Sequence, residues 1–584
     1  MDTVLHCASQ SEGAAATLLT SLLQVLFTTY CSISSSSLWP QDYGEIGVNI
    51  GFGDYDFIVV GAGSAGSVVA NRLSANSSWK VLVLEAGGDP PIESEIPGFA
   101  MSFQRTDYAW NYYTEPSDKE CLAYLNNSCY WGRGKFIGGC GAANMLMYFG
   151  GSQIDYDTWL NNGNTGWGWN DVLPYFDQEE IVTNHFSHYD PLEYYLKTSA
   201  NEMGLPYIRN YKYVNEEAFT NGFAILQNGR RMSSGKTYLA PVKNRENLHI
   251  VKNARVRKIN INNSRACSVT FMYKDGQEYT VRSNKEIILS TGPLDSPKLL
   301  MLSGIGPAKE LSKLGINPKT DLKVGRNLQD HVTIQMFFKL NNYSFYENQL
   351  DSLNEYLVNS SGPLSSINLE GFCGFIKINS TEEYPTVAYY YSKEPKNSEF
   401  SIDFKPEIAE SLRQQSLSNV ILVAWVTILR PKSSGFMELR SNDYRDDPIF
   451  HAQYFEKRED IEMLVEGMKF QLNMLEMESF RKLGAEFLKL NLPDCNQFTF
   501  KSDEYLECYM KHIGNTCNHQ CCTVKMGPKH DPSSVVDPRL SVKGIENLRV
   551  IDASVMPSVV SSNTNGPTMM IAEKGSAMII EDWS

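Results

Sequence analysis

The clearest pattern of apolar and polar positions lies near the N-terminus, between Tyr55 and Gly88. Residues 56–60 form a short apolar run that is typical of a buried strand, and residues 80–84 form a second run of the same kind. Residues 67–73 lie between these runs and are predicted to be a helix. The pattern therefore predicts a strand–helix–strand unit, which is the building block of a parallel sheet.

Further apolar runs extend this pattern along the chain. Strands are predicted over 247–251, 255–259, 268–273, 279–281 and 286–292, followed by a helix over 297–302 with a proline in its first turn. Residues 336–514 differ in character, because strand-like runs at 420–426 and 435–439 accompany one long amphipathic stretch at 460–477. This part of the chain is predicted to be a second lobe, a sheet with helices, that shapes a substrate pocket.

These patterns divide the chain into four parts. Residues 1–50 are predicted to be a leader, continuing into a linker over 37–53. Residues 51–335 are predicted to form mainly a nucleotide-binding domain, together with part of the substrate lobe and a lid-like aromatic excursion at about 92–130. Residues 336–514 are predicted to be the substrate-binding domain, and residues 515–584 return to the first domain.

The turn between the first strand and the helix carries the sequence Gly-Ala-Gly-Ser-Ala-Gly at 61–66. Such glycines permit a tight turn, close approach of the backbone to a pyrophosphate, and close packing of helix on strand. The helix N-terminus offers unpaired N–H groups and the positive end of its dipole to that pyrophosphate. Glu85 ends the second strand, at roughly the 20-residue distance expected of an acid that accepts hydrogen bonds from ribose. The unit predicts a dinucleotide site, and a glycine-rich turn without a ligand is the alternative.

Composition and charge limit the classes of partner. The 584 residues are 42% hydrophobic and 20% charged, as in a globular protein with a large core. The formal net charge of −15 argues against nucleic acid and anionic membranes as partners. Residues 14–36 carry no charge, and their apolar part at 18–27 resembles the core of a signal peptide, so secretion is expected. Because no Lys or Arg precedes it, an intracellular protein with a docked or disordered leader is the alternative. No other stretch is long and apolar enough to span a membrane.

The cysteines and glycosylation sequons agree with secretion. Cys121 and Cys129 flank one short polar loop, and Cys495 and Cys508 flank another, which is typical of local disulfides in a secreted protein. Sequons that would be glycosylated in such a protein occur at Asn76, Asn126, Asn262, Asn342, Asn359 and Asn379.

A second group of cysteines raises the question of a metal. Cys517, Cys521 and Cys522 cluster around His519. Their spacing does not match a good zinc site, so no metal is predicted, and a metal bound by this cluster is the alternative.

Four further stretches resemble the signatures of one enzyme family. They are Gly-Arg-Gly-Lys-Phe-Ile-Gly-Gly at 132–139 with Asn144, the stretch 292–307, Val-Gly-Arg-Asn-Leu-Gln-Asp-His at 324–331, and a C-terminal block made of 536–540, 548–554 and 563–568. Together they resemble the glucose–methanol–choline (GMC) oxidoreductases, in the family's order and over nearly the whole chain after the leader. The loop between Cys121 and Cys129 is similar to that of insect members, which resemble FAD-dependent glucose dehydrogenases and ecdysone oxidases.

The resemblance implies a doubly wound α/β FAD-binding domain of Rossmann type, interleaved with an α+β substrate lobe built on an antiparallel sheet. It implies FAD rather than NAD. We expect FAD to be bound without a covalent link, because Ala143 stands where some members carry a flavin-linked histidine. The residues expected to bind FAD are Gly61, Gly63, Ser64, Ala65, Gly66, Glu85, Ala86, Arg133, Gly138, Gly139, Asn144, Val256, Asp552, Ala553, Asn563, Pro567 and Thr568.

The resemblance also implies a catalytic pair. His519 falls in the position of the family's catalytic histidine, because the stretch that follows it keeps the family's register at 523–527. A neutral imidazole near pH 7 suits the removal of a proton from an alcohol, whereas an ordinary packed histidine is the alternative. Asn563 matches the second catalytic position, where an amide can hold the substrate oxygen, and Asn565 is the competing assignment.

Two departures from the family pattern lie close to these positions. The pair Cys140-Gly141 stands where two serines often follow the first signature. Cys522 stands where the family has a small residue, three positions after the catalytic histidine. Cys521 and Cys522 are therefore expected to crowd the flavin face or to change the shape of the substrate.

The expected function is FAD-dependent oxidation of an alcohol to a carbonyl compound, by hydride transfer to flavin N5 and proton removal by His519. The electrons are then expected to pass to oxygen or a quinone. The expected partner is a small-molecule alcohol, and an ecdysteroid, a sugar or another small alcohol fits. A hydroxynitrile-lyase type of activity and a catalytically silent small-molecule-binding member on the same fold are the alternatives.

Overall fold

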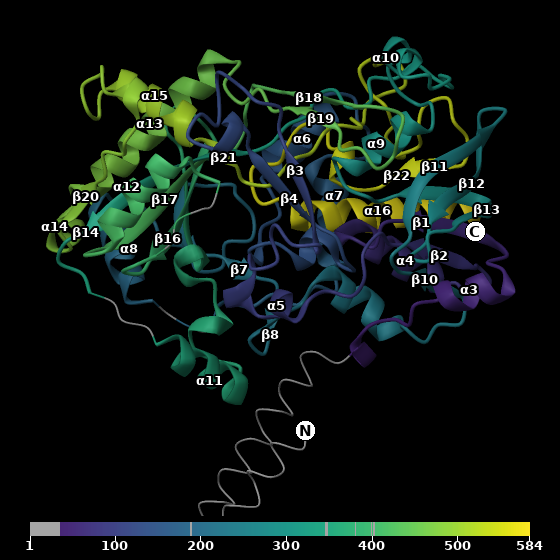
Figure 1. The fold of residues 1–584 in the computed structure, drawn as a ribbon, viewed down its shortest axis with the longest axis horizontal. Helices are drawn as coiled ribbons and strands as arrows, with labels where there is room; N and C mark the ends of the chain where they lie inside the picture. Colours follow the sequence, from purple (N-terminus) through teal and green to yellow (C-terminus); the bar gives the residue numbers. More distant parts are fainter. Residues whose placement is uncertain are drawn as a thin grey trace, which may run out of the picture.

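Two seven-stranded sheets organise the part of the chain that the structure describes (Figure 1). This computed structural model describes residues 36–584 except 187, 189, 345–347, 380, 399, 401 and 402. The apolar segment 18–27 of the expected signal peptide lies outside the described residues. In Figure 1 the mainly parallel sheet lies on the right and the antiparallel sheet on the left, with helix α16 (Asn565–Trp583) between them.

The first sheet has the strand order β10–β2–β1–β13–β12–β11, and β22 also pairs with β13. Its strands are β1 (Asp54–Val60), β2 (Val81–Leu84), β10 (Leu248–Val251), β11 (Arg255–Asn262), β12 (Arg265–Met272), β13 (Glu278–Leu289) and β22 (Leu548–Val550). β1 runs parallel to β2 and β13, and helix α4 (Ser64–Ser74) connects β1 to β2. β2 is apolar and buried along its whole length, as expected of a parallel strand covered on both faces. The predicted strand–helix–strand unit is confirmed.

The second sheet is antiparallel, with the order β20–β14–β17–β16–β15–β6, and β21 also pairs with β14. Its strands are β6 (Ala218–Asn221), β14 (Val332–Leu340), β15 (Phe372–Ile376), β16 (Val387–Glu394), β17 (Val420–Ile428), β20 (Ala485–Phe487) and β21 (Asn515–Thr516). The amphipathic helix α13 (Arg458–Leu475) packs on β17 and β16. The predicted fold class is confirmed. The lobe also takes β6 and β21 from segments that lie outside 336–514.

Further helices and short hairpins surround the two sheets. The helices are α3 (Gly44–Ile50), α5 (Ile92–Glu95), α6 (Gln153–Asn161), α7 (Trp169–Asp177), α8 (Pro191–Glu202), α9 (Asp295–Leu302), α10 (Ala308–Lys313), α11 (Gln349–Asn359), α12 (Pro406–Ser416), α14 (Glu478–Lys482) and α15 (Asp503–Ile513). The strands of the small two-stranded sheets are β3 (Ala109–Tyr113), β4 (Tyr130–Gly134), β5 (Met147–Tyr148), β7 (Phe223–Ala224), β8 (Leu226–Gln227), β9 (Arg230–Arg231), β18 (Phe436–Glu438) and β19 (Ile449–His451). None of the helices in the described ranges combines the length and the apolar character needed to cross a bilayer. The sequon asparagines Asn76, Asn126, Asn262, Asn342, Asn359 and Asn379 are all exposed.

The prediction of a linker over 37–53 is wrong, because part of this segment forms helix α3 (Gly44–Ile50). The segment is held against the first sheet by tertiary contacts. A carboxylate oxygen of Asp42 accepts a hydrogen bond from the hydroxyl of Tyr273 at 2.8 Å, and the other accepts one from the N–H of Lys252 at 3.0 Å. A seven-residue helix containing two glycines has little intrinsic stability, so it depends on these contacts rather than on its own sequence.

Both predicted local disulfides are present in the structure. They join Cys121 to Cys129 and Cys495 to Cys508, with Cα–Cα separations of 5.7 and 5.6 Å. These separations lie in the ordinary range for disulfides. Each bond closes a short loop and is expected to stabilise the folded chain by about 2–4 kcal/mol.

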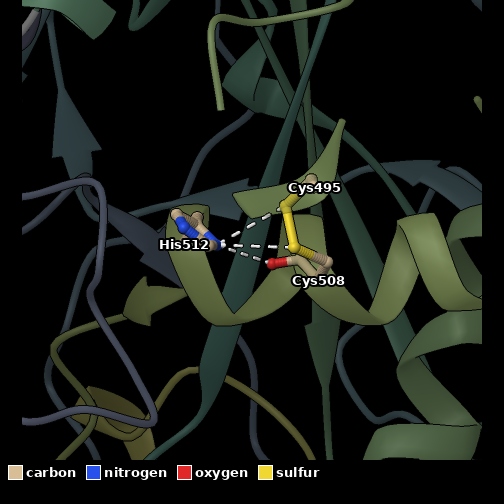
Figure 2. Close-up of side chains that lie close together, drawn as sticks. All are labelled: Cys495, Cys508 and His512. Atoms are coloured by element: carbon tan, nitrogen blue, oxygen red, sulfur yellow. Dashed lines mark hydrogen bonds between the residues drawn. A yellow bond between two sulfur atoms is a disulfide. The ribbon is translucent and has the colours of Figure 1, made fainter. Parts of the chain in front are cut away.

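Figure 2 shows that His512 lies beside the second of these disulfides. Its Nδ1 lies 3.6 Å from the sulfur of Cys495, 3.9 Å from the sulfur of Cys508, and 2.9 Å from the Cys508 carbonyl oxygen. Within the described ranges, these three residues are the one group of side chains spaced closely enough to hold a metal ion. Because metals are bound by thiolates and the sulfurs here are bonded to each other, we interpret the group as a disulfide with a neighbouring hydrogen-bond donor.

Candidate active site

A cleft beside the carboxyl ends of β1 and β2 collects most of the predicted site residues. It contains about 1480 Å³ of space that protein atoms do not fill, counting its open mouth. Its wall includes the first turn of α4, residues of 133–147, the loop 518–520 and the start of α16. Open α/β sheets bind their ligands in crevices outside the carboxyl ends of the strands, so this position is the expected one.

Bare backbone forms the wall of the cleft at the start of α4. No side chain caps the first N–H groups of this helix, whose N-cap is Gly63. Gly63 faces Gly139 closely, because a Cβ on Gly139 would lie 2.9 Å from the Cα of Gly63. A pyrophosphate can therefore approach the backbone without a side-chain clash, and the helix dipole favours its negative charge. Gly66 serves helix–strand packing instead, since a Cβ there would overlap the carbonyl oxygen of Gly61.

The carboxylate of Glu85 shapes the turn on which the cofactor is expected to lie. One of its oxygens accepts the N–H of Ala62 at 2.8 Å, and the other accepts the N–H of Gly87 at 2.8 Å. Burial raises the pKa of Glu85, whereas these backbone donors act in the opposite direction. These two bonds hold the glycine-rich turn against the end of β2. Glu85 also lines the cleft, where the ribose of the cofactor is expected.

Asp552 joins two of the family-like blocks at the wall of the cleft. One carboxylate oxygen accepts the N–H of Gly292 at 2.9 Å and the hydroxyl of Ser296 at 2.6 Å. The other accepts the N–H of Ser554 at 2.8 Å. These bonds tie the 292–307 stretch to the C-terminal block, which explains why residues so distant in the chain line one cleft.

The structure brings together most of the residues predicted to bind FAD. Those that line the cleft are Gly61, Gly63, Ser64, Ala65, Glu85, Ala86, Arg133, Gly139, Asn144, Val256, Asp552, Ala553, Asn563 and Thr568. Gly66, Gly138 and Pro567 lie behind its wall, where Gly138 donates its N–H to the Ala62 carbonyl oxygen at 2.7 Å. An uncapped helix end, bare backbone and a buried acid in one elongated cleft suit the chemistry of a flavin dinucleotide, so the residues present fit FAD.

Three residues without a predicted cofactor contact, which include the chain neighbour of Val256, also line the cleft. The guanidinium of Arg255 lies 4.9 Å from the ring centre of Trp110 and 5.2 Å from that of Tyr444, in two cation–π contacts. Trp110 belongs to the aromatic segment 92–130, which the sequence predicted to be lid-like, so its sequence context did indicate a position near the site. Arg255 and Tyr444 carried no such indication, because they are far apart in the chain and meet only in the fold.

His519 and Asn563 both line the cleft and lie next to each other. Nε2 of His519 lies 3.3 Å from Nδ2 of Asn563, and Oδ1 of Asn563 accepts a hydrogen bond from the hydroxyl of Tyr390 at 3.3 Å. Asn565 faces elsewhere, since its Oδ1 accepts the hydroxyl of Ser64 at 2.7 Å. The geometry therefore favours Asn563 over Asn565 as the partner of His519.

The environment of His519 keeps its imidazole neutral. The side chain belongs to a residue that is only 8% exposed, and burial lowers its pKa well below the usual value of a histidine. The neighbouring His331 and the positive charge of Arg133 lower it further. A neutral ring can act as a base at its unprotonated nitrogen throughout the physiological pH range.

Asp330 is a structural residue of this site to which the sequence assigned no role. Its carboxylate accepts the backbone N–H of His519 at 2.9 Å, the hydroxyl of Thr516 at 2.5 Å and the hydroxyl of Tyr454 at 2.8 Å. Burial raises the pKa of Asp330 to about 6, although the hydrogen bonds oppose that shift. The sequence signal for Asp330 was its place in the block 324–331, which resembles a family signature but was given no role of its own.

Of the cysteines that depart from the family pattern, Cys140 lines the cleft, whereas Cys521 and Cys522 do not reach it. Cys521 and Cys522 are fully buried, and neither lines its wall, so the expectation that they crowd the flavin face is not met. Cys522 has a φ of 72°, in the left-handed region that favours glycine. A cysteine in this conformation strains the backbone three residues after His519, and it does not narrow the cleft.

Comparison with known proteins identifies the family. A model of the N-terminal domain of GMC oxidoreductases matches residues 55–333, and a model of their C-terminal domain matches residues 431–572. Glucose dehydrogenase (FAD, quinone) of Drosophila melanogaster is 33% identical over 610 residues, covering 99% of this chain and 94% of that protein. Ecdysone oxidase of Bombyx mori is 31% identical over 605 residues, covering 98% of this chain and 88% of that protein.

Solved structures agree with this identification. A variant of formate oxidase from Aspergillus oryzae is similar with a TM-score of 0.77 and 26% identity, over 91% of this chain and 99% of that one. The resemblance to the GMC family seen in the sequence is thereby confirmed. The chain belongs to the GMC oxidoreductase family of FAD-dependent enzymes.

Proposed function

We propose that the protein oxidises an alcohol to a carbonyl compound with non-covalently bound FAD. The observation that carries this proposal is that His519 and Asn563 lie within 3.3 Å of each other in the same cleft as the backbone cradle for a dinucleotide. A base and an amide at one point can bind a hydroxyl group in two ways at once. The amide holds its oxygen, while the base accepts its proton.

FAD, when bound, supplies the acceptor for the hydride of the carbinol carbon. His519 removes the hydroxyl proton at Nε2, because its lowered pKa leaves that nitrogen unprotonated near pH 7. Asn563 orients the substrate oxygen and stabilises the negative charge that develops on it as the proton leaves. His519 is buried and Asn563 is half-buried, which reduces competition from water and strengthens these interactions.

The names of relatives support a range of substrates. Similar proteins are a glucose dehydrogenase that uses a quinone and an ecdysone oxidase. The proposed substrate is accordingly a sugar, an ecdysteroid or another small alcohol, and the proposed electron acceptor is a quinone or oxygen.

Anaerobic mixing of the FAD-loaded protein with sugars, ecdysteroids and aromatic alcohols is expected to bleach the flavin with at least one class. Admitting oxygen or a quinone to the bleached sample then identifies the acceptor by the faster return of colour. Dithionite serves as a control, because it reduces accessible flavin without a substrate. Flavin that dithionite reduces but no alcohol reduces would contradict the proposal and favour a silent binding protein. Cleavage of a cyanohydrin without bleaching would favour a lyase.

The purified protein is expected to be yellow and to release intact FAD on acid or heat treatment. Ala143 cannot form the histidyl link that some family members form at this position, and the cradle would hold the cofactor by backbone N–H groups. The measurement is the absorbance and mass of the supernatant after precipitation. Flavin that remains with the precipitated chain would show a covalent bond elsewhere, and folded protein that cannot bind FAD at all would overturn the cofactor assignment.

A further inference from the structure

The block at 324–331 lies behind the loop that carries His519. Gln329 and Cys521 exchange two backbone hydrogen bonds, of 3.2 and 2.9 Å, and Asp330 accepts the backbone N–H of His519 at 2.9 Å. The next residue, His331, reaches the side chain of His519 directly, with 2.8 Å between the two Nδ1 atoms. Three consecutive residues of this block, 329–331, therefore hold the loop of the base at His519 and Cys521.

The hydrogen bonds of His331 determine where its proton lies. Its Nε2 is 3.0 Å from the carbonyl oxygen of Leu429, which can only accept, so Nε2 carries the hydrogen. His331 is 1% exposed, and burial lowers its pKa to about 4, which keeps the ring neutral. A neutral imidazole with hydrogen on Nε2 has a lone pair on Nδ1. That lone pair faces Nδ1 of His519, which must then be the donor of their shared hydrogen bond.

We propose that His331 is a positioning residue that keeps the proton of His519 on Nδ1, and so keeps the lone pair of the base on Nε2 at the cleft. The inference rests on the proposed function, since it gives His519 the role of base. In Ser–His–Asp triads, a carboxylate holds the catalytic imidazole in one tautomer in the same way. In this protein the neutral imidazole of His331 takes the place of that carboxylate.

A second chain of hydrogen bonds reaches the same tautomer from the opposite side. The hydroxyl of Tyr390 donates to Oδ1 of Asn563, which leaves the Nδ2 hydrogens of Asn563 to point at Nε2 of His519. A hydrogen bond from the Asn563 N–H group requires a lone pair on Nε2 of His519. Both series of hydrogen bonds therefore place the lone pair of His519 on Nε2, although one starts at Leu429 and the other at Tyr390.

A neutral partner also has an electrostatic consequence. A carboxylate in place of His331 would raise the pKa of His519, whereas His331 and Arg133 both lower it. Asp330 is the nearby acid, and it is engaged by the backbone N–H of His519 rather than by its ring. After His519 has taken the substrate proton, its ring is positively charged. The bond from Nδ1–H to His331 then becomes charge-assisted and stronger.

The direct test is to measure the tautomers in the parent protein. In holoenzyme labelled with ¹⁵N-histidine, nitrogen chemical shifts and long-range couplings distinguish a protonated nitrogen from an unprotonated one. His519 is expected to be protonated at Nδ1 and His331 at Nε2, with assignments from the His519→Gln and His331→Gln variants. A His519 ring protonated at Nε2 would overturn the proposal. This readout needs no turnover, so it stands even if no alcohol reduces the flavin and the proposed function fails.

Two variants of His331 separate positioning from packing. His331→Leu keeps similar bulk without an acceptor, and it is expected to slow flavin reduction by about 10–100-fold, by analogy with the loss of a group that orients a metal-binding imidazole. His331→Gln can donate to the Leu429 carbonyl and accept from His519, so it is expected to retain a rate within about 3-fold of the parent. His451→Leu, a histidine replacement outside the cleft, controls for the loss of an imidazole as such.

Rates in these variants are normalised to bound FAD. Equal losses in His331→Leu and His331→Gln would show a packing role, and an unchanged rate in His331→Leu would show no role; either result contradicts the proposal. Where His331→Leu does not fold, the rate of His331→Gln and the tautomers of the parent decide the question.

Discussion

Replacing His519 by alanine is expected to slow flavin reduction by about 10²–10⁴-fold while leaving FAD bound. This loss corresponds to roughly 3–5 kcal/mol of barrier. The reason is that His519 offers the unprotonated Nε2 in the cleft, and alanine offers no group that can take the proton. The measurement is stopped-flow reduction under anaerobic conditions, with FAD content determined for each preparation. A variant that reduces its flavin as fast as the parent at neutral pH would place the base elsewhere.

The pH dependence of this effect follows from the pKa of His519. Because burial, His331 and Arg133 lower that pKa, the ring stays neutral as the pH falls through the usual histidine value. The parent rate is therefore expected to stay level through about pH 6.5 and to fall only in more acidic solution. The rate of His519→Ala is expected to rise with pH, since the alcohol then loses its proton without help. A parent rate with a midpoint near pH 6.5 would contradict the lowered pKa.

Asn563→Ala is expected to slow flavin reduction by about 10²–10³-fold, or roughly 3–4 kcal/mol, by analogy with the loss of one oxyanion donor. The amide is held by Tyr390 on one side and faces His519 on the other, so it is oriented before the substrate binds. Alanine removes the donor to the developing negative charge but leaves the base. The shape of the pH profile is therefore expected to stay that of the parent, which separates this effect from that of His519→Ala.

Asn565→Ala is the matched control for that experiment. Its amide accepts from the hydroxyl of Ser64 at 2.7 Å and no contact joins it to His519, so a smaller loss is expected after normalisation to bound FAD. A larger loss in Asn565→Ala than in Asn563→Ala would show that the assignment of the two asparagines is reversed. The two positions are only two residues apart, and the sequence alone left both open. The backbone of the turn before α16 decides which amide faces the base.

The first strand–helix–strand unit could be predicted because its determinants are local. Apolar runs at 56–60 and 80–84, a glycine turn between them and an acid at Glu85 all lie within one continuous stretch. The two local disulfides could be predicted for the same reason, since short loops join their cysteines. The site residues followed from motif register, which places His519 in line with its family position without showing its contacts.

Long-range contacts set the limit of such prediction. The linker over 37–53 contains helix α3, because Asp42 and its neighbours bind residues near the edge of the first sheet. The strain at Cys522 likewise depends on the path of the folded backbone. The local sequence of 37–53 carried a misleading pattern, and that around Cys522 carried no sign of the strain.

The sequence by itself determined the cofactor class and the family, and it predicted His519 as the base, because each is encoded in residues that stand close together or in register. Only the tertiary structure decided which segments complete the antiparallel sheet, which asparagine faces His519, and how the base is held. His331 and His519 are separated by 188 positions, yet their rings lie within one hydrogen bond of each other. No local preference specifies that contact. It arises because buried nitrogens must be paired once water is excluded, and the folded chain alone determines which partners are within reach.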